Sequence, residues 1–218
     1  MQPITVTVGP LDAADDNGIA ISQTTLGPAN LTLNGALVTG GVAILDAPRR
    51  VIITSAGNDS GITFTVTGTT YGGHTVSETI NGASGGAATT TVDFATVTRI
   101  RASGATSISG VIAGTNGVAG SRWVRLDGWA FPQTAIQCNA SGTVNYTVQV
   151  CLDDPNSPTD PVSIPNMTWL NTNDSDAVSA IGDVYSNFDW TPTWARILLN
   201  SGNGSVTGTF AQFNVVSK

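Results

Sequence analysis

Few residues in this chain could carry acid–base chemistry. The only histidine, His74, stands in the stretch TTYGGHTV, where the Gly-Gly pair predicts a hairpin turn. A nucleophilic site needs a base that is held by packing, and an exposed turn does not hold one. We therefore expect His74 to face water, and we expect no Ser-His-Asp or Cys-His catalytic site.

Paired carboxylates could serve glycoside hydrolysis if one of them had a raised pKa. The candidates are Asp15 with Asp16, Asp153 with Asp154, and Asp174 with Asp176. All of them lie in loops rich in Gly, Pro or Asn, where water keeps aspartates ionised. The prediction is that the protein is not an enzyme.

Two acidic loops, DAADDNG and NTNDSDAVSAIGD, raise the question of calcium. Neither loop has carboxylates at its first, third and fifth positions followed by a bidentate Glu. Asp and Asn form turns through their own backbone hydrogen bonds, which explains both loops without a metal. We expect no metal ion and no cofactor.

The two cysteines, Cys138 and Cys151, flank the stretch CNASGTVNYTVQVC. If this stretch is a β-hairpin that turns at residues 140–142, Cys138 lies opposite Val144 or Asn145. Cys151 is then too far away for a disulfide bond, so both thiols are predicted to be reduced and packed. With a single histidine in the chain, a zinc site is not expected.

The composition is that of an all-β protein. The 218 residues include 25 Gly and 10 Pro among many Thr, Ser, Val and Ile, with one Glu (Glu78) and one Lys (Lys218). Helices usually carry Glu, Lys, Leu and Ala, whereas strands favour β-branched residues. Short runs of alternating polar and apolar residues, such as ITFTVTG and HTVSETI, predict consecutive strands. Asn34-Gly35 and Gly40-Gly41 predict tight turns.

The predicted organisation is two tandem β-sandwich domains behind a short arm. Residues 1–17 have few apolar anchors and are expected to form a flexible or partner-bound N-terminal arm. Residues 18–118 and 132–218 are the two predicted sandwiches, and residues 119–131 are a linker that is rich in glycine at first. An immunoglobulin-like and a jelly-roll strand order both fit the sequence.

Two phrases of the sequence occur twice. Arg99-Ile100 in TRIRASGATSISG matches Arg196-Ile197 in ARILLNSGNGSVTG, and SGITFTV matches SGTVNYTV with one residue gained. Internal duplication explains the match, and so does the limited vocabulary of β-turns. Strand alternation places the two isoleucines inward and the two arginines outward. Arg99 and Arg196 are then either solvated or candidates for an interface with acidic partners.

The five tryptophans suggest either packing or binding. Trp190 aligns with Phe94 in the repeat, which predicts that it is a core residue. Trp123 and Trp129 lie between the two predicted sandwiches and are candidates for a domain or subunit interface.

Charged residues make up 11% of the chain, and the net charge is -7. An acidic surface repels phosphate, so no nucleic acid is expected as a partner. Charge this sparse also predicts that neighbouring proteins cover much of the surface. The start MQPITVTVGP has no signal-peptide pattern and no run of transmembrane length, so we expect synthesis in a host cytoplasm and no membrane contact.

Several phrases resemble small virion structural proteins of tailed bacteriophages. They include ADDNGIAISQT, NLTLNGALVTGGVAILDAPRRVIITSAGNDSGITFTVTG and the closing ARILLNSGNGSVTGTFAQ. The resemblance covers residues 14–118 and about the last thirty, but not the region from DDPNSPTDP to FDWTP. It implies a protein of the virion whose partners are the major capsid protein or other virion proteins, and a homo-oligomer in the assembled particle.

Three functions follow as expectations. The first is a capsid decoration or cement protein that clasps shell subunits with its N-terminal arm, and its alternative is a tail, collar or short fibre component. The rival from another class is a carbohydrate-binding or adhesin module, which the tryptophans and the Asp/Asn loops suggest.

Overall fold

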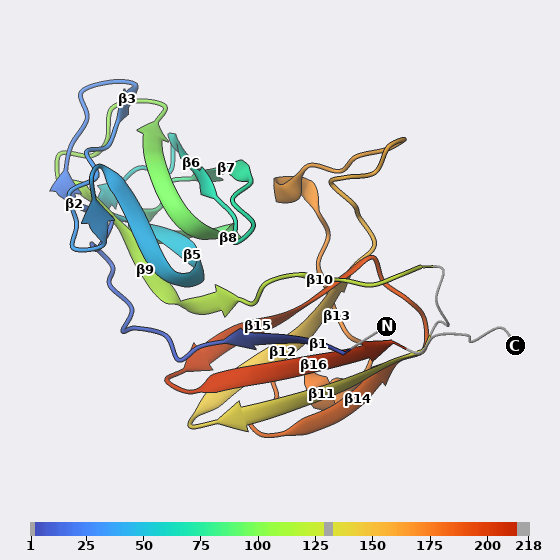
Figure 1. Cartoon of the computed structure of the whole chain (residues 1–218). Coiled ribbons are helices and arrows are strands. Elements are labelled where there is room, and N and C mark those ends of the chain that lie inside the picture. The colour runs from blue at the N-terminus through green and yellow to red at the C-terminus, as the bar shows by residue number, and fades with distance from the viewer. Residues whose placement is uncertain (1–2, 129–132, 213–218) are drawn as a thin grey trace, which may run out of the picture. The chain divides into compact units, whose positions relative to one another are not determined.

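The computed structural model describes residues 3–128 and 133–212, and these residues form an almost entirely β structure (Figure 1). Within them the helical elements are two single turns of 3-10 helix, η1 (Ile164–Asn166) and η2 (Ser175–Ala177). The all-β prediction is confirmed. No helix in this part of the chain has the length and hydropathy of a membrane span.

The chain divides into two compact units that are not in simple tandem order. The first unit is Ala13–Gly117, and the second combines Met1–Asp12 with Val118–Lys218. The reason is β1 (Ile4–Val8), which pairs antiparallel with the last strand, β16 (Ser205–Gln212), from Ile4 opposite Phe210 to Val8 opposite Val206. The expected free arm over residues 1–17 is therefore wrong for β1, whose Val6 and Val8 are buried.

In the first unit the main strands follow the order β9-β5-β8-β6-β7. Long strands β5 and β8 dominate, and β8 pairs with β5 along most of its length and with β6 at its end. Breaks in register bend both long strands, so one sheet wraps around a core that includes Phe64, Phe94 and Ile100. The strands of this unit are β2 (Ala20–Gln23), β3 (Ala29–Asn30), β4 (Val38–Thr39), β5 (Val42–Asn58), β6 (Thr63–Thr69), β7 (Thr75–Asn81), β8 (Ser84–Ala102) and the start of β9 (Val111–Gly120).

Of the two tight glycine turns predicted before β5, Gly40-Gly41 is confirmed, whereas neither Asn34 nor Gly35 has the positive φ that such a turn requires. Gly40 and Gly41 join β4 to β5 with φ values of 61° and 83°, which only glycine adopts without strain. His74 is exposed in the turn between β6 and β7, as expected.

Glu78, the only glutamate of the chain, accepts backbone hydrogen bonds at a bulge in β8 where pairing with β5 is interrupted. The register between β5 and β8 shifts between Arg50 and Ile52, and the Glu78 carboxylate on β7 accepts hydrogen bonds from the backbone N–H groups of Thr91 and Val92 at 2.9 Å. The Thr91 hydroxyl also donates to it at 2.8 Å. One side chain thus satisfies the amide groups at a bulge, where strand pairing is disrupted.

The second unit is a β-sandwich of two facing sheets. One sheet has the order β1-β16-β11-β14, and the other contains β13, β12 and β15, with β10 and the end of β9 also paired to β15. A Cβ at Gly208 would overlap the side chain of Ile197, so the two sheets approach closely at that position. Its further strands are β10 (Val124–Arg125), β11 (Thr134–Ser141), β12 (Val144–Cys151), β13 (Leu170–Asn171), β14 (Val184–Phe188) and β15 (Trp194–Gly202).

The stretch from Cys138 to Cys151 is not the hairpin that the sequence suggested. β11 pairs with β14 and β16, whereas β12 pairs with β13 and β15, so the turn at Gly142 carries the chain from one sheet to the other. Both cysteines are nevertheless free and buried, as expected.

The expected linker over residues 119–131 is also structured where it is described. Ala119 and Gly120 pair with Leu199 and Leu198, and β10 pairs with the start of β15. Trp129 and Phe131 lie outside the described residues.

The repeated phrases occupy the same positions in the two units. Val66 pairs with Ile100 and Thr67 with Arg99 between β6 and β8. Between β12 and β15, Val148 pairs with Ile197 and Gln149 with Arg196. All four apolar residues are fully buried, so the two sequence matches correspond to one pair of adjacent strands in the same register in each unit.

The Glu78 bridge predicts a graded loss of stability. Glu78→Ala leaves two backbone donors without their acceptor, and it should lower the free energy of unfolding by about 1.5–3 kcal/mol, the range for hydrogen bonds to charged groups. Glu78→Gln retains one acceptor oxygen and should lose less. Urea unfolding measures both variants, and equal stability of Glu78→Ala and wild type would show that the bridge contributes nothing.

Candidate functional site

Five tryptophan and arginine side chains form a continuous row of ring contacts in the second unit. The Arg196 guanidinium lies 4.2 Å from the centre of the Trp169 ring, and Trp169 lies 5.2 Å from Trp123. Trp123 is 6.0 Å from Trp194, and the Arg125 guanidinium is 5.2 Å from the Trp194 ring. These separations are those of aromatic and cation–π contacts. We call these five residues the Arg–Trp row.

Hydrogen bonds anchor the row at both ends. Arg196 Nε donates to Gln149 Oε1 at 3.0 Å, and Arg125 Nη2 lies 3.0 Å from Asp154 Oδ2. Arg196 is 3% exposed, so its charge depends on the Trp169 ring and on Gln149, whereas the Arg125 side chain is 55% exposed. The Arg196 guanidinium requires such partners because burial removes the water that would otherwise stabilise its charge.

The geometry of β15 explains why these residues meet. Trp194 and Arg196 alternate with Ala195 and Ile197, so the first two point outward from the sandwich and the second two point into its core. The pairing of Arg125 with Trp194 and of Gln149 with Arg196 places one partner at each end. Arg196 does face outward, as predicted, but Trp169 of the same chain covers it.

The long loop between β12 and β13 depends on the row. The Thr168 N–H donates to Asp153 Oδ2 at 2.6 Å, which closes the loop at its base, and Trp169 follows directly. Within the loop, the N–H groups of Ser157 and Val162 both donate to the Asp154 carbonyl. A loop whose ends are joined by a hydrogen bond and whose interior residues hydrogen-bond to one another is a compact Ω-loop. Segments of this type often carry function.

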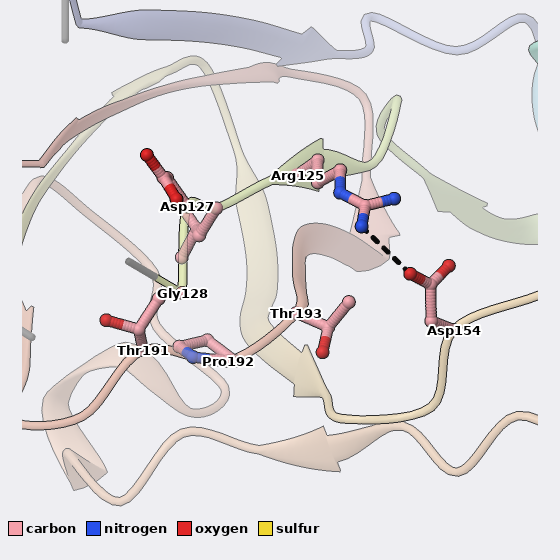
Figure 2. A pocket seen from close by; sticks show the side chains of 8 residues that line it. Arg125, Asp127, Gly128, Asp154, Thr191, Pro192 and Thr193 are labelled. Carbon is pink, nitrogen blue, oxygen red and sulfur yellow. Dashed lines mark ion pairs between the residues drawn. The ribbon is translucent and has the colours of Figure 1, made fainter. Parts of the chain in front are cut away.

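A pocket of about 450 Å³ lies beside the Arg125 end of the row (Figure 2). Arg125 and Asp154 point toward one another on one side with Thr193 near them, and Asp127 lies on the other side with Thr191 nearby. The Asp127 backbone is fixed by Gln212, whose amide accepts from its N–H and donates to its carbonyl, both at 2.9 Å. The Arg125 guanidinium is already paired with the Asp154 carboxylate, and the rest of the polar lining is the Asp127 side chain with the hydroxyl groups of Thr191 and Thr193.

A second hollow of about 250 Å³ was not predicted. Trp190, Asn173, Asp174, Asn187 and Asp189 line it, together with Val150, Thr172 and Phe188. Trp190 is 39% exposed, so its predicted place in the core is wrong. It follows β14 on a bend, where the repeat partner Phe94 lies inside a continuous strand. The nearby Asn and Asp residues were the available signal for this site.

The sequence predicted four interface residues, and the structure does not bring all of them together. Arg99 belongs to the first unit, is exposed, and lies 3.4 Å from the Thr67 hydroxyl. The Arg–Trp row contains Arg196 and Trp123 but not Arg99, and Trp129 is outside the described residues. Among the described residues, no group of three or more His, Cys, Asp or Glu side chains could hold a metal ion.

The Cys138 thiol, one of two buried thiols in the second unit, is held in its protonated form. Burial raises the pKa of Cys138 to about 11, and a hydrogen bond with Tyr146 opposes this shift. Burial also raises the pKa of Tyr146, whose hydroxyl donates to the Gly182 carbonyl at 2.9 Å. Because the thiolate is the nucleophilic form, Cys138 is inert near neutral pH.

No family model, curated protein or solved structure matches this chain. Its function is therefore inferred from the arrangement of its own residues.

The Arg–Trp row predicts that one ring controls the order of the β12–β13 loop. Trp169→Ala removes the ring that covers Arg196, so amide hydrogen exchange should accelerate at Thr168 and in the loop, while β11 and β16 stay protected. The exciton signal that closely spaced indoles give in circular dichroism should also weaken. Trp190→Ala is the matched control and should leave both measurements unchanged. Unchanged exchange in Trp169→Ala would mean that the loop is ordered without the row.

Proposed function

We propose that this protein is a non-enzymatic structural protein of a bacteriophage virion, and more specifically a capsid decoration or cement protein on the outer shell. The sequence resemblance to such proteins supports this proposal. The observation that carries the proposal is a set of large apolar side chains on loops and strands that are exposed to water. They occur in both units and include Leu26 (100% exposed), Ile108 (98%), Tyr185 (82%) and Ile181 (78%).

Exposed leucines are common on protein surfaces, but fully exposed large residues in a charge-poor chain favour a partner-bound surface. The net charge of -7 favours an outer face of the shell, away from packaged nucleic acid. A virion role requires many copies placed side by side, which agrees with few charges and many protein contacts.

The mode of attachment differs from the one that the sequence suggested. The start of the chain is built into the sandwich of the second unit as β1, so Ile4–Val8 is not a free clasp for shell subunits. In the proposal, the units attach through their exposed loops, as rigid bodies, and β1 stabilises the second unit.

The copy number of this chain in purified particles tests the proposal. We expect quantitative mass spectrometry to find it at hundreds of copies, in near-integer ratio to the major shell subunit. A dozen or a few dozen copies would instead assign it to the tail, collar or a short fibre, and its absence from particles would overturn the virion function.

A second candidate function is carbohydrate binding, which the hollow around Trp190 favours. A half-exposed indole offers a flat face for a sugar ring, and Asn173, Asp174, Asn187 and Asp189 offer amides and carboxylates for its hydroxyl groups. The volume of about 250 Å³ suits one sugar unit.

Titration with methyl glycosides of glucose, galactose, mannose and N-acetylglucosamine tests this function by tryptophan fluorescence. One of them should give a saturable shift with a Kd of roughly 1 mM, near the value that a few weak contacts supply. Trp190→Ala should abolish the shift, and Trp190→Phe should keep part of it. A flat response to all four sugars would contradict the carbohydrate function.

A further inference from the structure

Two loops at one end of the first unit carry its most exposed apolar side chains. Leu26 lies between β2 and β3 and is 100% exposed, and Ile108 lies between β8 and β9 and is 98% exposed. β2 and β9 pair antiparallel, with Gln23 opposite Val111, so the two loops leave neighbouring strands at the same end. We call residues 24–28 and 103–110 the apolar tip.

Buried threonines join the two loops of the apolar tip. The Thr25 N–H donates to Thr106 Oγ1 at 2.8 Å, and the Thr106 N–H donates to the Thr25 carbonyl at 3.1 Å. The Thr25 hydroxyl donates to the Gly104 carbonyl at 3.0 Å. Each threonine is only 7% exposed, so these bonds are largely shielded from water. Leu26 directly follows one clamped residue, and Ile108 lies two residues after the other.

A buried carboxylate fixes the second loop. Asp59 is 2% exposed, and its Oδ1 accepts a hydrogen bond from the Ser107 N–H at 2.6 Å. Its Oδ2 is buried and has no hydrogen-bond partner in the described structure. Burying a carboxylate oxygen without a partner is costly, so such a group needs an explanation. The explanation that we offer is that Asp59 orders the loop containing Ile108 through its hydrogen bond with Ser107.

We propose that the apolar tip is a docking knob, with Leu26 and Ile108 as its anchors, for an uncharged apolar hollow on a shell subunit. This inference rests on the proposed virion function and names the surface that performs it. A protein docks best through apolar anchors that are already held in place, because little side-chain and loop entropy remains to be lost on binding.

Charge identifies the kind of partner. The stretches SQTTLGPAN (22–30) and SGATSISG (103–110) contain no charged residue, so the tip selects its partner by shape and apolar contact. A membrane with anionic lipids would repel a chain of net charge -7, and Arg101, which lies opposite Asn30 beside the tip, adds only one positive charge there. A second copy of this chain fits poorly, because the two hollows of the second unit are lined mostly by polar side chains.

The test compares the wild type with Leu26→Ser/Ile108→Ser in binding to shells of the encoding phage that were assembled without this protein. Both side chains are exposed, so the double variant should keep the wild-type unfolding midpoint. His74→Ser, in the exposed turn between β6 and β7, is the control because His74 has no part in the proposed attachment. We expect the double variant to bind about a hundredfold more weakly, or about tenfold for each anchor, and the control to bind like the wild type. Wild-type binding should change little between low and high salt.

A second pair of variants tests the role of Asp59 as a positioning residue. Asp59→Ala should accelerate hydrogen exchange at the Ser107 amide and weaken shell binding several-fold, whereas Asp59→Asn retains an acceptor and should restore both. A merely structural role would lower stability without this rescue of binding.

The outcomes separate the two proposals. If wild type and double variant bind shells equally, the apolar tip is not the docking surface, although the virion function stands. If the wild type does not bind shells at all, the virion function is overturned, and the docking proposal with it. Binding to vesicles of phosphatidylcholine and phosphatidylglycerol that depends on Leu26 and Ile108 would also overturn the docking proposal, because the partner of the tip would then be lipid and not a shell subunit.

Discussion

Strand β15 has to be covered on both of its faces, and the rest of the second unit follows from that requirement. Its inner face packs Ala195, Ile197 and Leu199 against the opposite sheet, and Gly208 keeps that sheet close. Its outer face carries Arg196, which can be buried only if a ring and a hydrogen-bond acceptor replace water around its charge. Trp169 and Gln149 supply these, and they explain why an 18-residue insertion between two strands is ordered rather than loose.

The first unit shows what happens without that insertion. Arg99 occupies the position of Arg196, beside Thr67 where the second unit has Gln149, and the same apolar pair lies underneath. β6 and β7 are joined by a short turn, so no tryptophan is supplied to cover Arg99, and it stays in water. The segment that begins with DDPNSPTDP, between β12 and β13, is therefore the segment that changes the environment of an otherwise equivalent arginine.

The sequence predicted features that depend on neighbouring residues. Alternation identified the strands and the inward-facing Ile100 and Ile197, and the Gly40-Gly41 pair identified a hairpin. It did not predict that the turn at Gly142 changes sheets, because a hairpin and a sheet-to-sheet corner use the same turn residues. The strand pattern of ITVTV was visible at the start of the chain, but its partner, β16, is about 200 residues away. The prediction for Trp190 was wrong because it assumed the strand conformation of Phe94. Trp190 instead lies in the bend that follows β14.

Order in the loops is what links this fold to the binding role that we propose. The Thr168–Asp153 hydrogen bond joins the ends of the β12–β13 loop, and Trp169 connects that loop to the Arg–Trp row. The apolar tip is held by the buried residues Thr25, Thr106 and Asp59. Each loop could form only a small contact with a partner, and a small contact is weak in solution. On a repetitive surface, however, many rigid copies bind with combined strength, because each bound point raises the effective concentration of the next. Rigid loops suit such an assembly, since the entropy of ordering them is lost during folding and not at each contact.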